Sequence, residues 1–124
     1  MFSSKTSNSQ SLKEGAIKLK KKIAIGINDF KTFILEGYYY VDKSLFIKEI
    51  DEDDSEVIVF YIPNGFGKTL NMSMLKYFYE RTEENNRTLF KGLMIEQYKE
   101  IMEQQGKYIV IYIFLLKRYI YIQF

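Results

Sequence analysis

The chain has 124 residues, enough for one domain, and its 47% hydrophobic and 27% charged residues are typical of a globular protein, not a disordered one. The net charge of +2, from 18 basic and 16 acidic residues, gives no whole-chain case for binding nucleic acid or an anionic membrane. The absence of Cys and His excludes disulfides, thiolate chemistry, Cys/His zinc sites and imidazole general bases.

Residues 1–22 are rich in Ser, Asn and Lys, a composition that predicts a disordered, basic leader ahead of the folded domain. The basic cluster within Lys18–Lys22 has two other interpretations, a nuclear address or a phosphate-binding arm. No long apolar stretch follows these basic residues, so the sequence does not predict a secretory signal. A cytoplasmic location is expected by default, and a nuclear one stays open.

Two short helices are expected next. The first covers Asp29–Glu36, with Asn28 as its cap and Gly37 as its stop. The second covers Lys43–Ile50, with Asp42 as its cap. Apolar residues recur at helical spacing in both segments, which predicts one buried face for each helix.

Two continuous apolar segments are the expected strands. Val57–Ile62 has no polar alternation, which is typical of a central parallel strand buried on both faces, and Pro63 ends it. Helical patterns follow over Lys68–Arg81 and Ile95–Gln105. The second strand, Tyr108–Leu116, is too short to span a bilayer, so no membrane association is expected. The predicted fold class is α/β, a partial P-loop NTPase-like βαβ sheet with flanking helices.

A candidate phosphate site lies where the first strand meets the long helix. Backbone N–H groups in a tight loop and a helix N-terminus hold phosphate, a Lys reaches its outer oxygens, and a Thr hydroxyl ligates Mg²⁺. The candidate nucleotide-binding residues are Asn64, Gly65, Phe66, Gly67, Lys68 and Thr69, with Thr69 as the Mg ligand. The first-glycine position of the strict motif holds Ile62 instead, so an ordinary strand–turn–helix corner with a surface Lys is the alternative.

Several motifs occur in the order that one known family has them. They are Lys22–Phe30, Tyr38–Ser44, Phe66–Leu75, Leu89–Leu93 and Gly106–Tyr108. Together they resemble the AAA-ATPase-like domain family, P-loop proteins in which this domain often precedes a PD-(D/E)XK nuclease-like domain. The resemblance implies a P-loop NTPase fold with ATP as the nucleotide and Mg as its metal.

The sequence departs from the family pattern beside the loop. The family usually has Arg-Pro-Arg-Arg before Phe-Gly-Lys-Thr, whereas this chain has Ile62-Pro63-Asn64-Gly65. Arg forms bidentate, charge-assisted hydrogen bonds to phosphate. Three missing arginines therefore predict weaker nucleotide binding than in a typical member.

A second departure concerns the Walker B element, an apolar strand that ends in acidic residues. No Asp or Glu follows Leu116, so that element is absent. Hydrolysis needs a carboxylate to help hold Mg²⁺ and position water. We expect a truncated N-terminal portion, with an AAA-ATPase-like fragment over 23–116 and an atypical hydrophobic tail over 117–124. The alternative is a non-binding remnant or protein-interaction module, with a protein partner at the exposed sheet edge.

Two further groups of charged residues lie before the candidate phosphate site, namely Asp42 with Lys43 and the run Asp51–Asp54. Asp42 and Lys43 belong to a family-like motif and lie near the nucleotide in one interpretation. In the other, they are a helix cap and an exposed Lys. The acidic run Asp51–Asp54 lacks the spacing of a calcium loop and is expected to be a solvated loop.

Overall fold

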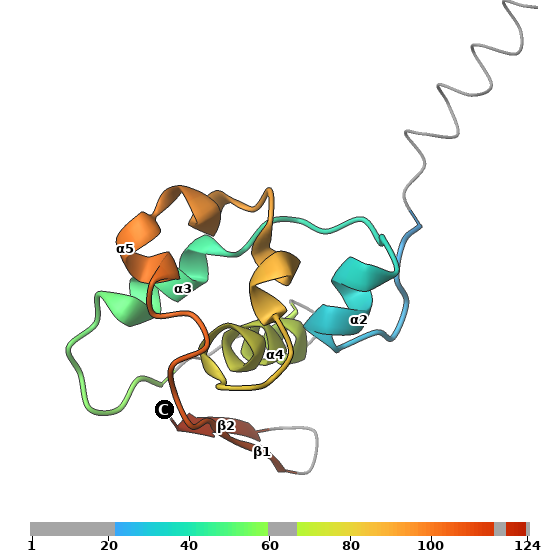
Figure 1. Cartoon of the computed structure of the whole chain (residues 1–124). Helices are drawn as coiled ribbons and strands as arrows, with labels where there is room; N and C mark the ends of the chain where they lie inside the picture. Colours follow the sequence, from blue (N-terminus) through green and yellow to red (C-terminus); the bar gives the residue numbers. More distant parts are fainter. Residues whose placement is uncertain (1–21, 60–66, 116–118, 124) are drawn as a thin grey trace, which may run out of the picture.

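The computed structural model describes residues 22–59, 67–115 and 119–123 (Figure 1). Within these ranges the chain forms short helices and one pair of strands. In chain order they are α2 (Phe30–Leu35), α3 (Leu45–Asp51), α4 (Lys68–Tyr79), η1 (Asn86–Phe90), η2 (Met94–Gln97), α5 (Lys99–Met102), β1 (Ile111–Leu115) and β2 (Tyr119–Gln123).

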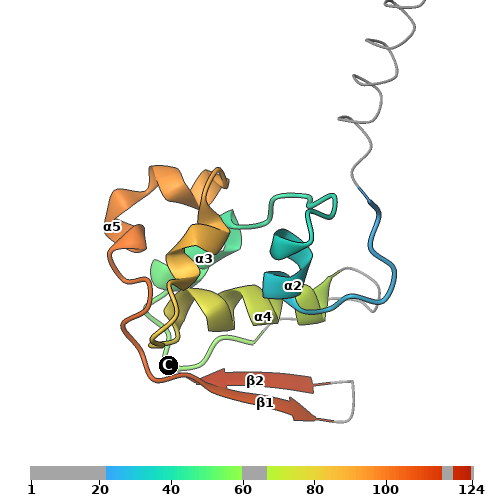
Figure 2. The same ribbon diagram turned by 45° about the vertical axis from the view of Figure 1, so that its right-hand side comes forward.

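Helix α4 is the centre of the molecule. It lies between the β1–β2 hairpin on one side and the remaining helices on the other, as Figures 1 and 2 both show. Phe78 on α4, Phe30 on α2 and Phe90 on η1 are all fully buried. The ring of Phe90 stacks on Phe30 and meets Phe78 edge-on, with both centroid distances at 5.2 Å. Such aromatic pairs stabilise beyond the area they bury, so they join three elements into one core.

The predicted helix over residues 29–36 is confirmed, with a different cap. Asp29, not Asn28, occupies the N-cap position, and its Oδ2 accepts a hydrogen bond from the Thr32 N–H at 2.9 Å. A carboxylate at this position satisfies a backbone donor that the helix itself leaves unpaired. The helix buries Phe30 and Phe33, as the apolar spacing predicts.

The second predicted helix is also confirmed, again with a shifted start. Helix α3 runs over Leu45–Asp51, and Ser44 holds its N-cap position without a side-chain cap bond. Asp42 is therefore not the N-cap residue of this helix. The buried residues Ile47 and Ile50 lie one turn apart and face the core.

The third predicted helix, Ile95–Gln105, is broken. The 3₁₀ turn η2 is followed by the single turn α5, and Tyr98 between them has φ −96° and ψ 83°, outside the helical region. Beyond α5, the Gly106 N–H donates to the Phe78 carbonyl at 2.8 Å, which returns the chain to the end of α4. Glu80 and Tyr108 then form an isolated parallel bridge.

The expected central strand is not present in the part of it that the structure describes. Val57–Val59 lie outside any strand, with Val57 73% and Val59 85% exposed. The rest of the expected strand, residues 60–62, lies outside the described residues. An apolar segment becomes a strand only where a neighbouring strand receives its backbone hydrogen bonds, and hydrophobicity alone does not supply that neighbour.

The second expected strand is present but pairs differently. β1 pairs antiparallel with β2, from Ile111 opposite Gln123 to Leu115 opposite Tyr119. The parallel βαβ sheet is therefore a wrong prediction for the described residues, although the mixture of helix and strand is as expected. β2 comes from residues 117–124, which the sequence predicts to be an atypical tail. A hairpin needs only a short connection, so the segment next in sequence is the readiest partner. No helix in these described ranges is long and apolar enough to cross a membrane.

Candidate functional site

The N-terminus of α4 begins at Gly67, which has left-handed backbone angles of φ 75° and ψ 23°. The Gly67 carbonyl accepts the first intrahelical bond, from the Asn71 N–H at 2.9 Å. A Cβ built at Gly67 meets no atom of the described residues within 4 Å, so among them the preference for Gly arises from the backbone angle and not from crowding. The N-cap residue itself, being Gly67, offers no side chain to cap this helix end. The first-turn N–H groups of α4 are thus of the kind that an external anion can accept from.

The described candidate residues Lys68 and Thr69 form the first turn of α4 and are half-buried. The other candidates, Asn64, Gly65 and Phe66, lie outside the described residues. Gly67 itself is exposed at the surface. The structure therefore places three of the six candidate phosphate-binding residues together at one helix end.

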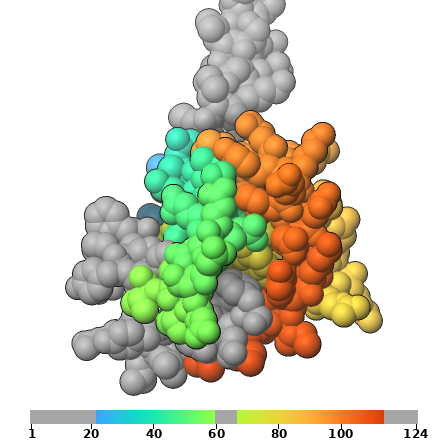
Figure 3. Space-filling model, turned by 90° about the vertical axis from the view of Figure 1, so that its left-hand side faces the viewer, coloured from blue at the N-terminus to red at the C-terminus, as the bar shows by residue number. Residues whose placement is uncertain are grey.

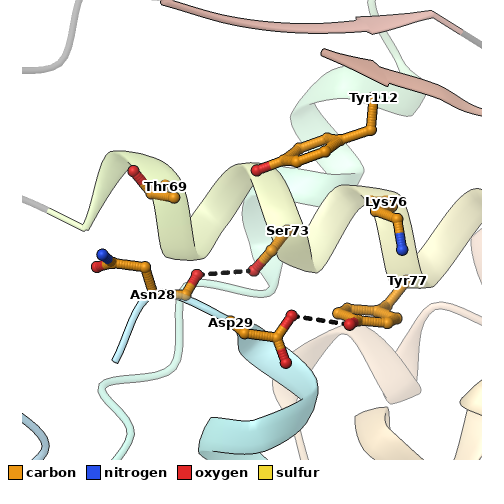
Figure 4. A pocket seen from close by; sticks show the side chains of 7 residues that line it. All are labelled: Asn28, Asp29, Thr69, Ser73, Lys76, Tyr77 and Tyr112. Atoms are coloured by element: carbon orange, nitrogen blue, oxygen red, sulfur yellow. Dashed lines mark hydrogen bonds between the residues drawn. The ribbon is translucent and has the colours of Figure 1, made fainter. Parts of the chain in front are cut away.

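A groove of about 320 Å³ begins at Thr69 and runs along α4 (Figure 4). Thr69, Ser73, Lys76 and Tyr77 form its floor, at spacings that place them on one face of the helix. The two walls come from distant parts of the chain. Its lining residues are Asn28, Asp29, Thr69, Ser73, Lys76, Tyr77 and Tyr112.

Ser73 fixes one wall of the groove to α4. Its Oγ is buried, accepts a hydrogen bond from the Phe30 N–H at 2.8 Å, and lies 3.3 Å from the Asn28 carbonyl oxygen (Figure 4). The Tyr77 hydroxyl, one turn further along α4, donates to Asp29 Oδ1 at 2.7 Å. Sequence reasoning missed both contacts and treated Asn28 and Asp29 as helix caps alone. The spacing of Ser73 and Tyr77 from Thr69, four and eight residues along one helix, is the signal that relates them.

The wall is also fixed electrostatically. Burial alone raises the pKa of Asp29, but hydrogen bonds from the Thr32 N–H and the Tyr77 hydroxyl outweigh it and hold the pKa below 3.8. Burial and the bond to Asp29 raise the pKa of the Tyr77 phenol. Near neutral pH the pair is a carboxylate and a neutral phenol. This pairing suits a structural role better than general acid–base catalysis, which needs a pKa near the working pH.

The far end of the groove carries a paired cation. The Lys76 Nζ lies 3.1 Å from a Glu80 carboxylate oxygen and 4.4 Å from the centroid of the Tyr77 ring. Its charge is therefore already balanced by Glu80 and by the aromatic face. An anionic ligand is expected to favour the Thr69 end of the groove over this one.

Asp42 connects two segments away from the groove. Its Oδ1 accepts from the Ser44 N–H at 2.8 Å, and its Oδ2 accepts from the Met94 N–H at 2.7 Å. The buried Ser44 adds a parallel contact, since its Oγ accepts from the Ile95 N–H at 3.1 Å. Figure 3 shows the segment around α3 beside residues 90–105 on one face of the molecule. This geometry supports a structural role for Asp42.

Lys43 is exposed, and its backbone N–H donates to the Tyr40 hydroxyl at 3.3 Å. Neither Lys43 nor Asp42 lines the groove that begins at Thr69. Over the described residues, no group of three or more Asp or Glu side chains is arranged to hold a metal ion. Thr69 as an Mg ligand stays a prediction from the sequence.

The start of α4 has the residue order Gly-Lys-Thr, with a positive φ at the glycine. The same order of residues at a helix start occurs in P-loop nucleotide-binding domains. Comparison with family models gives the particular family: residues 24–120 match the AAA-ATPase-like family, described as "Predicted AAA-ATPase". The chain belongs to this family, as its motifs predict. No curated protein and no solved structure matches the chain.

Proposed function

We propose that this chain binds ATP with Mg²⁺ at the N-terminus of α4. Backbone N–H groups across Asn64–Gly67 surround the phosphates, Lys68 neutralises the β and γ oxygens, and Thr69 ligates Mg²⁺. The observation that carries the proposal is the left-handed Gly67 directly before Lys68 and Thr69 at the start of α4. Membership of a predicted ATPase family supports the same assignment.

The electrostatics of α4 favour an anion at this end. The helix has 12 residues, long enough for its aligned peptide dipoles to place partial positive charge at the N-terminus. No acidic residue occurs in its first turn, and Lys68 adds a full charge there. Thr69 opens onto the groove, so a hydroxyl is available at the edge where a metal-bound phosphate would lie.

We further propose that binding is not followed by efficient hydrolysis in this 124-residue chain. No Asp or Glu follows Glu103, so no acidic residue can end a strand in the manner of a Walker B element after α5. Asp29 lines the groove, but Thr32 and Tyr77 already bind its carboxylate. We expect phosphate release from Mg-ATP at the rate of the protein-free control.

Isothermal titration with Mg-ATP tests the binding proposal. Lys68→Ala should weaken binding at least about tenfold, since it removes a charge-assisted contact to phosphate. Lys91→Ala is the matched control, because Lys91 is an exposed lysine just after η1 and outside the groove. Equal affinities for the two variants, or no heat with the wild type, would reject the proposal.

A second candidate function is protein interaction through the outer face of β1. Ile109, Ile111 and Ile113 alternate along the chain and are 83%, 48% and 41% exposed, whereas Val110 and Tyr112 between them pack toward the core. Exposed apolar faces of this kind are typical of interaction surfaces. Ile113→Lys should reduce self-association or partner capture without changing Mg-ATP affinity. An unchanged sedimentation profile would count against this candidate.

A further inference from the structure

The groove continues beyond the place where the phosphates are proposed to lie. From Thr69 to Lys76 its floor follows α4 for seven residues, roughly 10 Å at the helical rise of 1.5 Å per residue. Its volume of about 320 Å³ is at the lower end of the range for small-ligand sites, ~300–1,000 Å³. A nucleotide held at Thr69 by its phosphates would thus have a groove beside it for its remaining part.

One wall of this groove is an aromatic ring. Tyr112 extends from β1 toward α4, and its ring lies over the helix between Ser73 and Lys76 (Figure 4). The residue is half-buried, and burial together with the charge of Asp29 raises the pKa of its phenol. The ring is therefore neutral at physiological pH, and a flat neutral ring is a surface on which any nucleobase can stack.

The opposite wall offers a polar group. Asn28 lies on the other side of α4 from Tyr112, displaced toward Thr69, and its carbonyl oxygen lies 3.3 Å from the Ser73 Oγ (Figure 4). Its side chain is exposed, and an amide supplies both hydrogen-bond donors and an acceptor. Such a group matches the edge of a nucleobase, which also presents donors and acceptors.

From this arrangement we propose that the groove beside α4 holds the nucleoside of the bound nucleotide, with its base against Tyr112 and its edge toward Asn28. The inference rests on the proposed function, since it requires the phosphates to lie at Thr69. Tyr112 and Asn28 supply affinity for the base, whereas Lys68 and the first turn of α4 supply affinity for the phosphates. A ligand that has phosphates but no base therefore measures the phosphate contribution to affinity without the base contribution.

The experiment compares Mg-ATP with Mg-tripolyphosphate, which has phosphates and no nucleoside. Titration calorimetry is run on the wild type, Tyr112→Leu, Asn28→Ala and Lys68→Ala. Tyr39→Leu is the matched control, because Tyr39 is 60% exposed and outside the groove. Circular dichroism of each variant verifies folding. If Tyr112→Leu does not fold, Asn28→Ala decides, because its backbone contact to Ser73 is unaffected.

We expect wild-type protein to bind Mg-ATP more tightly than Mg-tripolyphosphate. Tyr112→Leu should weaken Mg-ATP binding by about 5- to 150-fold, the usual range for loss of one base–aromatic stack. It should leave Mg-tripolyphosphate unchanged, whereas Lys68→Ala should weaken both ligands.

Equal wild-type affinities for the two ligands would overturn this inference and leave the phosphate site standing. Full Mg-ATP affinity in both Asn28→Ala and folded Tyr112→Leu would do the same. Absence of binding by either ligand would overturn the proposed function and this inference together.

Discussion

At the scale of single residues, the Asp29 carboxylate accepts hydrogen bonds from two different elements. It caps α2 through the Thr32 N–H, and it holds the groove wall to α4 through the Tyr77 hydroxyl. Both bonds favour the charged form, which is why the pKa of Asp29 is lowered despite partial burial. A carboxylate that prefers its folded environment links protonation to stability.

We predict that Asp29→Asn is less stable than the wild type at pH 7, by about 0.5 kcal/mol because the site is largely solvent-screened. The folded pKa lies below the unfolded value of 3.8, so the charge contributes fully above that pH. The contribution is lost as the pH falls through the folded pKa. Urea unfolding at pH 7 and pH 3 measures the difference between the two proteins. The difference in the free energy of unfolding between wild type and Asp29→Asn should be smaller at pH 3 than at pH 7. A larger difference at pH 3 would contradict this account.

Asp42 is the residue whose role the sequence leaves open, and a pair of measurements decides it. Asp42→Ala removes the acceptor of two backbone N–H groups, on Ser44 and Met94, so we predict a loss of about 1–3 kcal/mol in the free energy of unfolding. Asp54→Ala, at an exposed position, should change stability by less than about 0.5 kcal/mol. Unchanged stability with weakened Mg-ATP binding would instead place Asp42 at the nucleotide.

At the scale of elements, the start of α4 depends on one backbone conformation. Any residue other than Gly at position 67 must adopt φ near 75°, which costs about 1–2 kcal/mol for most side chains. Gly67→Val should therefore lose about that much stability, while Gly67→Asn should lose less because Asn tolerates this region. Thermal unfolding of the two variants compares the backbone effect, since a Cβ at position 67 has no close neighbour in the part of the chain that the structure describes. Equal stability of Gly67→Val and wild type would mean that the positive φ is not required.

Helices were more predictable than strands, for a physical reason. The signals for α2, α3 and α4 are local: apolar spacing around Phe30 and Phe78, and a stop at Gly37. A strand depends on a partner elsewhere in the chain. The apolar segment that begins at Val57 therefore predicted a buried strand, whereas its described part, Val57–Val59, forms no strand and exposes both valines. The apolar segment that contains Ile111–Leu115 correctly predicted a strand there. It did not predict that this strand pairs antiparallel with Tyr119–Gln123.

At the scale of the whole molecule, the candidate site combines three distant segments. Gly67, Lys68 and Thr69 are contiguous and were predictable from their own chemistry. The groove beside them also needs Asn28 from before α2 and Tyr112 from β1, which only the fold brings together. Family membership over residues 24–120 accounts for the contiguous motif and leaves these groove contacts to be tested on this chain.

The central claim is that the first turn of α4 binds the phosphates of a nucleotide through its backbone. The most direct measurement is a ¹H–¹⁵N correlation spectrum of the labelled chain, recorded during titration with Mg-ATP. The account predicts that the largest saturable shifts occur in the amides of Gly67, Lys68 and Thr69, and that Lys68→Ala needs at least about tenfold more Mg-ATP to reach half of them. Shifts absent from these amides, or centred on other parts of the chain, would contradict it.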